Sequence, residues 1–261
     1  MSELQSGLQA FIAQGVFAFM LTFVRVGTAL MIMPGLGDNL VPQQVRLYIA
    51  LGFTFVIFPI TSSYMPNPMP SSVLLFVLII FEFVTGVFIG TIARILLTAL
   101  DVAGMILSMM IGLGNAQMFN PIMASQGSLI GAFLSITGIT LLFVTNMHHL
   151  LLMGVFESYH AFPVGEMLEA ESMAEMIAKV VSSSFRIGIQ MSLPLIVIGT
   201  IMYISMGVLA RIMPQIQVFM LAMPLQVLLG LITFGMIAAT AVLFWLKEFE
   251  NGMVFFLSQS F

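Results

Sequence analysis

Cysteine is absent from this chain, and charged side chains are scarce. With no Cys among 261 residues, the chain has no disulfide framework, no thiol nucleophile and no cysteine metal site. Only 7% of its residues are charged, whereas ordinary soluble domains have about 25%. Hydrophobic residues make up 60% of the chain, and a soluble protein of that composition could not cover its surface with polar groups. The composition therefore predicts an integral membrane protein.

Long uncharged runs support the same conclusion. No Asp, Glu, Lys or Arg occurs in Val102–Phe156, in Ile187–Ala210 or in Ile212–Leu246. At a helical rise of about 1.5 Å per residue, the first of these runs could cross a bilayer more than twice. The runs are continuous, whereas outer-membrane strands alternate apolar and polar residues. We therefore expect an all-α membrane protein, because a helix satisfies its own backbone in lipid.

Turn residues divide the chain into about six long helices and one broken element, all within a single domain of residues 1–261. The predicted helices span about Leu8–Met33, Gln43–Pro59, Ser71–Leu100, Ser128–Phe156, Lys179–Met213 and Gln215–Trp245. Between the fourth and fifth lies the plainly solvated region of the chain, Glu157–Lys179, which is rich in glutamate. A short amphipathic helix is predicted there, from Glu166 to about Ala178.

The broken element lies in Gly104–Pro121, which is apolar but interrupted. Its helix breakers and costly amides are Gly112, Gly114, Asn115, Gln117, Asn120 and Pro121. Non-helical backbone at membrane depth is tolerated only inside protein or beside a water-filled cavity. The pattern therefore predicts a re-entrant or interior loop.

Methionine is unusually frequent, with 24 residues in the chain. Met is flexible and unbranched, so a surface rich in it can repack around varied partners. For any single Met, a lipid-compatible gap-filler is the simpler interpretation. The grouping with Gly and Asn around the broken element favours a loop that seals a pore yet deforms around a passing chain; the methionines concerned are Met105, Met109, Met110, Met118 and Met123.

Enzyme and metal signatures are missing from the sequence. It has no H-E-x-x-H, G-x-S-x-G or phosphate-loop motif. Gly112–Gln117 begins like a dinucleotide fingerprint but ends in Gln and follows no strand. His148 and His149 are adjacent, so on a helix they cannot form an i,i+4 metal pair, and Asp101 has no carboxylate at i+3 or i+4. We therefore expect no catalytic residues, no cofactor and no metal.

Charged residues within the apolar runs are expensive in lipid, so each should face a partner or water. Arg25 and Glu82 lie near the centres of their predicted helices, which favours buried partners. For Arg46, Arg94 and Arg211, snorkelling to the interface is an equally good interpretation. Glu82 is nearly alone as a mid-helix acid, and this counts against a proton relay.

Five stretches of the chain stand out in combination. They are Pro34 to Arg46 with a second proline at Pro42, Gly86-x-x-x-Gly90, Ala103-Gly104 to Pro121 with Gly112, His149-Leu150 to Pro163, and Gly207 to Phe219 followed by Pro224. In this order, over most of the chain, they resemble the FliR family of flagellar export-gate proteins, whose injectisome counterparts share the same core.

The resemblance implies an architecture and partners. The N-terminal part, about residues 1–178, is expected to be FliP-like, and the C-terminal helical hairpin, about residues 179–261, FliQ-like. One copy of such a chain joins FliP-like and FliQ-like subunits in a closed, helically arranged hetero-oligomer. Many of the apolar helices would then be buried against partner subunits as well as against membrane lipid.

The resemblance also implies roles for individual residues. The loop near residues 105–121 maps onto the family's pore plug, or gate, which gives Met105, Ile106, Met109, Met110, Ile111, Gly112, Leu113, Gly114, Asn115, Gln117, Met118 and Phe119. Buried polar or inter-subunit contacts are expected from Arg25, Glu82, Arg94, Arg211, Gln215 and Gln217.

The function implied is that of a core subunit of the flagellar type III protein export gate, in the bacterial inner (cytoplasmic) membrane at the flagellar basal body. Its partners would be the other export-apparatus proteins and unfolded export substrates, with no nucleic acid and with energy supplied by partners. Two alternatives stay open. One is the equivalent subunit of a virulence injectisome, and the other is a small-solute transporter, for which the sequence lacks the expected inverted repeats.

Overall fold

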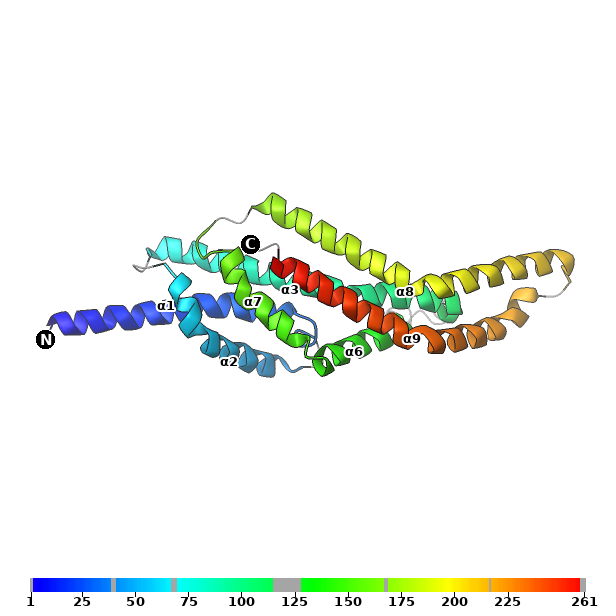
Figure 1. Ribbon diagram of the computed structural model, residues 1–261, viewed down its shortest axis with the longest axis horizontal. Coiled ribbons are helices and arrows are strands. Elements are labelled where there is room, and N and C mark those ends of the chain that lie inside the picture. The colour runs from blue at the N-terminus through cyan, green and yellow to red at the C-terminus, as the bar shows by residue number, and fades with distance from the viewer. Residues whose placement is uncertain are drawn as a thin grey trace. The chain divides into compact units, whose positions relative to one another are not determined.

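The computed structural model describes residues 2–38, 41–66, 70–114, 128–166, 169–215 and 217–258. Throughout these ranges the regular structure is helical, and no strand occurs in them. In chain order the helices are α1 (Ser2–Ile32), α2 (Gln43–Thr61), the short 3₁₀ helix η1 (Ser62–Tyr64), α3 (Ser72–Ile111), α6 (Leu129–Val144), α7 (His148–Ala161), α8 (Ala170–Ile212) and α9 (Val218–Ser258) (Figure 1).

Five of these helices are long and apolar enough to cross a membrane, or six spans if α6 and α7 together form one broken crossing. The five spans are Ile12–Ile32, Gln43–Tyr64, Ser72–Ile111, Ala170–Ile212 and Ala222–Val254. The prediction of an all-α membrane protein is therefore confirmed, since the uncharged runs are helices of bilayer length.

Helix α3 is longer than predicted. It continues past Leu100 to Ile111, so the residues from Met105 to Ile111 are helical and the predicted end near Leu100 was wrong. Gly104, the first residue of the predicted broken element, lies inside α3. A Cβ at this position would collide with the Gly131 backbone of α6, so the glycine permits a close helix contact instead of breaking the helix.

The predicted helix from Ser128 to Phe156 is two helices. The chain turns between α6 and α7, where Asn146 has a φ of 60°. Asparagine tolerates this left-handed conformation better than most residues do, and a residue in that conformation ends a helix. Val144, Thr145 and Asn146 all have modest helix propensity and were the available signal for the break, but they lie inside an uncharged run.

The last two helices are also longer than predicted. α8 begins at Ala170, so the expected separate amphipathic helix is the first part of α8, and α9 extends past Trp245 to Ser258. Charge marks where solvation changes, but Lys and Glu are good helix formers and do not end a helix. Pro194 lies within α8 and Pro224 within α9 without ending either helix.

The chain forms two compact units. Unit 1 comprises Met1–Ile95, Asn146–Val180 and Asn251–Phe261, and unit 2 comprises Leu96–Thr145 and Val181–Glu250. In unit 1, a buried cluster joins α1, α3 and α7 through Phe17, Ala18, Leu21, Met65, Leu78 and Tyr159. A Cβ at Gly86 would lie 2.5 Å from the Arg25 carbonyl oxygen, so this glycine lets α3 contact the α1 backbone.

Unit 2 is built around the C-terminal part of α3. Trp245 of α9 is fully buried and donates its indole N–H to the Leu96 carbonyl at 3.0 Å. Gly138 of α6 lies where a Cβ would contact the Trp245 ring at 3.2 Å, and a Cβ at Gly188 of α8 would lie 2.9 Å from the Ala99 carbonyl oxygen. Glycine on α6 and α8 therefore allows both helices to approach their neighbours in unit 2 closely.

Candidate functional site

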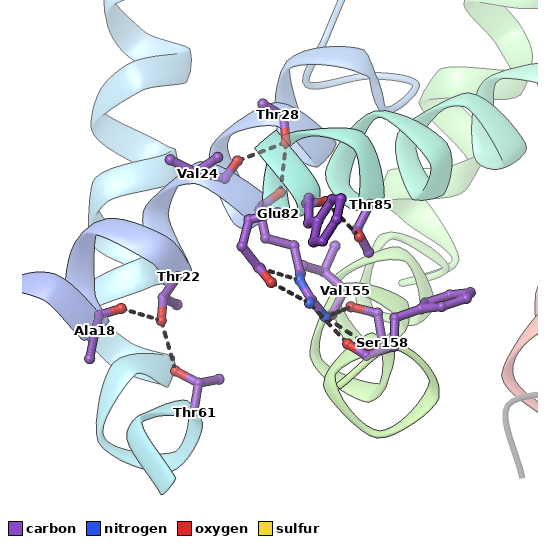
Figure 2. A network of polar contacts seen from close by, with 12 residues as sticks. Ala18, Thr22, Val24, Thr28, Thr61, Glu82, Thr85, Val155 and Ser158 are labelled. Carbon is purple, nitrogen blue, oxygen red and sulfur yellow. Dashed lines mark hydrogen bonds and ion pairs between the residues drawn. The ribbon is translucent and has the colours of Figure 1, made fainter. Parts of the chain in front are cut away.

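A buried ion pair lies inside unit 1. Arg25 of α1 and Glu82 of α3 are each 1% exposed. The guanidinium donates twice to the carboxylate, from Nε to Oε2 at 2.6 Å and from Nη2 to Oε1 at 2.7 Å. Figure 2 shows Glu82 at the centre of this polar network, with Ser158 of α7 close by. A bidentate pair of this kind is the strongest form that an arginine–carboxylate contact takes.

Arg25 also reaches the C-terminal end of α7. Its Nη1 donates to the Ser158 carbonyl at 3.0 Å, and its Nη2 donates to the Phe162 carbonyl at 2.9 Å. The Ser158 carbonyl also accepts the Phe162 backbone N–H at 2.8 Å, so Arg25 is a second donor to it. A cation at a helix C-terminus also interacts favourably with the helix dipole. The Tyr159 ring lies beneath the guanidinium, 4.1 Å from the Arg25 Cζ atom to the ring centroid. One side chain therefore joins α1, α3 and α7 inside unit 1.

Arg94 occupies a more exposed site in the same unit. Its Nη1 donates to Asp38 Oδ1 at 2.7 Å, and its side chain is 43% exposed. Asp38 also accepts the Gly35 backbone N–H at 2.8 Å, while Arg46 donates to the Gly37 carbonyl at 3.0 Å. These charges hold the turn that follows α1, and none of them lies in the middle of the apolar core.

The described part of the predicted plug is the end of α3 and the residues that follow it. Met105 and Met109 are exposed, Ile106 and Met110 are half-buried, and Ile111 is fully buried. Gly112 ends the helix with a φ of 88°, and Leu113 and Gly114 follow, both half-buried. The remaining predicted plug residues, Asn115, Gln117, Met118 and Phe119, lie outside the described residues.

Two polar residues that the sequence did not single out lie against this end of α3. Gln226 of α9 is 3% exposed, and its Nε2 donates to the Met110 carbonyl at 2.9 Å and to the Tyr203 hydroxyl at 3.0 Å. Tyr203 of α8 donates in turn to the Met109 carbonyl at 3.4 Å. The sequence signal for this contact was the Gln226 amide inside the uncharged run of α9, because a buried amide requires hydrogen-bond partners.

The other predicted contact residues are on the surface of the chain. Arg211, Gln215 and Gln217, around the connection between α8 and α9, are exposed. These three residues belong to unit 2. The hydrogen-bond partners described above for Arg25 and Glu82 lie within unit 1.

The described ranges contain no cluster of side chains suited to binding a metal ion. No group of three His, Asp or Glu side chains lies there close enough to hold a metal ion. The Asp101 carboxylate accepts the Ser135 hydroxyl at 2.5 Å. The rings of His148 and His149 are neighbours, with centroids 4.2 Å apart. These contacts link side chains within the protein and do not form a converging site.

Comparison with known proteins gives one consistent result. Residues 16–252 match the model of the family "Bacterial export proteins, family 1". A flagellar biosynthetic protein FliR of Caulobacter vibrioides is 33% identical over 237 residues, covering 90% of this chain and 94% of that protein. The FliR proteins of Aquifex aeolicus and Bacillus subtilis are 31% and 30% identical, over 83% and 82% of this chain and 83% of each of those proteins. The chain therefore belongs to family 1 of the bacterial export proteins.

Proposed function

We propose that this chain is a core subunit of the flagellar type III protein export gate. In the bacterial inner membrane, at the flagellar basal body, one copy would form with FliP-like and FliQ-like subunits the pore through which unfolded flagellar proteins pass. The observation that carries the proposal is the similarity to flagellar FliR proteins of three bacteria, at 30–33% identity over more than four fifths of the chain. Those names favour the flagellar role over an injectisome.

The exposed face of α8 supports an assembly with other subunits. Within unit 2, large exposed apolar residues recur at every third or fourth position and form a stripe that winds around this helix, at Val181, Phe185, Ile189, Leu193, Val197, Ile201, Ile204, Val208 and Ile212. Arg186 and Gln190, one turn apart, are exposed beside this stripe. A charge and an amide are costly against lipid, so a neighbouring protein surface suits them better.

In the proposed mechanism the plug begins at the end of α3. The segment containing Met105 to Phe119 closes the pore at rest, and its methionines yield as an unfolded chain passes. The seal would be steric, because the described part of the segment, Met105–Gly114, contains no charged side chain. The energy for export would come from partner proteins, since the sequence contains no nucleotide-binding motif.

Deleting Met109–Gln117 is expected to make the assembled gate permeable to ions at rest. The deletion removes the last turn of α3 and part of the proposed plug, so the pore loses its seal. The measurement is the ion conductance of the complex with FliP-like and FliQ-like partners in planar bilayers, after co-purification has shown that the shortened chain still assembles. Unchanged conductance in an assembled complex would refute the plug assignment.

A further inference from the structure

The end of α3 presents carbonyl oxygens that no intrahelical donor can reach. In a helix the last four carbonyls lack such a donor, and in an apolar environment each must find one elsewhere. The Gly112 N–H donates to the Met109 carbonyl at 3.1 Å, and the Met110 carbonyl accepts from Gln226 at 2.9 Å. A buried amide on α9 therefore supplies a donor that the backbone at the end of α3 lacks.

Glycines let the turn at the end of α3 pack closely against α8 and α9. A Cβ at Gly199 of α8 would lie 3.3 Å from the Met110 Cβ, and a Cβ at Gly230 of α9 would lie 3.0 Å from the Ile111 Cα. A Cβ at Gly112 would lie 3.2 Å from the amide carbon of Gln226. Three consecutive residues, Met110 to Gly112, therefore each pack against α8 or α9. These contacts determine where α3 ends.

We propose that Gln226 and Tyr203 are positioning residues of the gate, forming a clamp that holds the end of α3 in its closed place. Their hydrogen bonds to the Met110 and Met109 carbonyls set the position and direction in which the chain leaves α3 at Gly112. The proposal rests on the proposed function, because it takes this turn as the base of the plug. Neither side chain contacts an export substrate in this role; both act through α3.

The first test replaces Gln226 with methionine, which has a similar length but no amide. The Met110 carbonyl then lies buried without its donor, and this favours arrangements in which the turn leaves its seat. We expect the resting conductance of the assembled gate to rise roughly tenfold, the population change that follows the loss of one buried hydrogen bond. Tyr203→Phe removes only a hydroxyl, and a rise of about two- to threefold is expected, since its bond to α3 is longer.

Thr233→Val on α9 is the matched control. Its hydroxyl donates to the Leu229 carbonyl of its own helix at 2.8 Å, so the substitution removes a polar group whose hydrogen bond lies within α9. The control gate should keep wild-type conductance. When Gln226→Met and Tyr203→Phe are combined, the rise in conductance should be smaller than the product of the two separate rises, because both side chains hold the same turn.

A reversible crosslink separates positioning from general stability. The chain contains no cysteine, so a Met110→Cys, Gly199→Cys pair is unique in it, and the 3.3 Å between the two Cβ positions is close to that of a disulfide. In the Gln226→Met background, oxidation should return the conductance to the wild-type value, and reduction should restore the leak. A Met110→Cys, Thr200→Cys pair controls for oxidation itself.

The outcomes distinguish the clamp from the gate. If deleting Met109–Gln117 opens the pore but Gln226→Met and Tyr203→Phe do not, the clamp is refuted and the export-gate proposal stands. If the deletion has no effect on conductance, the plug fails and the clamp falls with it. A Gln226→Met leak that the engineered disulfide does not reverse, or a Gln226→Met chain that no longer assembles while Tyr203→Phe conducts normally, also overturns the positioning role.

Discussion

Glu82→Leu is expected to lower the free energy of unfolding by about 3–5 kcal/mol, the usual cost of removing one partner of a buried ion pair. Arg25 would remain inside unit 1 with its charge uncompensated, while its bonds to the Ser158 and Phe162 carbonyls could not neutralise it. The measurement is denaturant unfolding of the purified protein in mixed detergent micelles, together with the amount that accumulates in the membrane.

The double variant Arg25→Met, Glu82→Leu provides the sharper comparison. Removing both charges leaves an apolar pair of similar size, so most of the lost stability should return, although the Ser158 and Phe162 carbonyls lose their bonds to Arg25. Arg94→Met is the control, because its ion pair with Asp38 is partly exposed and should be worth less than about 1 kcal/mol. A double variant no more stable than Glu82→Leu would contradict the view that the uncompensated charge causes the loss.

Gly104→Ala is expected to cost about 3 kcal/mol, the upper part of the range for overpacking a core. The added methyl group would collide with the backbone of Gly131, and backbone cannot rotate aside as a side chain can. The same junction contains the Ser128 hydroxyl, which donates to the Gly104 carbonyl at 2.8 Å and accepts the Gly131 N–H at 3.0 Å. Separating α3 from α6 would therefore also break the bond from Ser128 to Gly104, whereas the bond to Gly131 caps α6 itself.

Gly235→Ala on α9 is the matched control for this substitution. No atom lies within 4 Å of a Cβ at Gly235, so the same change should be neutral or slightly stabilising, because alanine favours a helix over glycine. Thermal denaturation of the two variants in the same detergent measures the difference. Equal melting temperatures would show that the α3–α6 contact is looser than its geometry indicates.

The helical class of the fold was predictable because the sequence contains its physical cause, although several helix limits were not. Uncharged runs of bilayer length leave the backbone no stable alternative to a helix, and Pro34-Gly35 marks the turn after α1. The burial of Arg25 and Glu82 was predicted from their places near the centres of their helices. That they bind each other could not be derived, since nothing local specifies which helices become neighbours.

Where the sequence misled, the cause was a residue whose role depends on a distant partner. The sequence around Gly104 does not show that this residue packs against Gly131, and Asn146 is an ordinary interfacial residue until its left-handed φ is known. Gln226 and Tyr203 gave little signal because their role lies in two carbonyls more than ninety residues away in the chain. Local propensity cannot report such long-range contacts.

Export of flagellar proteins by the bacterium that makes this chain tests the central claim most directly. The gene is removed, and the hook and filament proteins in the culture medium are quantified, with the wild-type gene restored on a plasmid as the control. We predict that these proteins disappear from the medium while their intracellular synthesis continues, and that the restored gene returns them. Flagellar export that continues unchanged without the chain, or a loss confined to virulence effectors, would contradict the account.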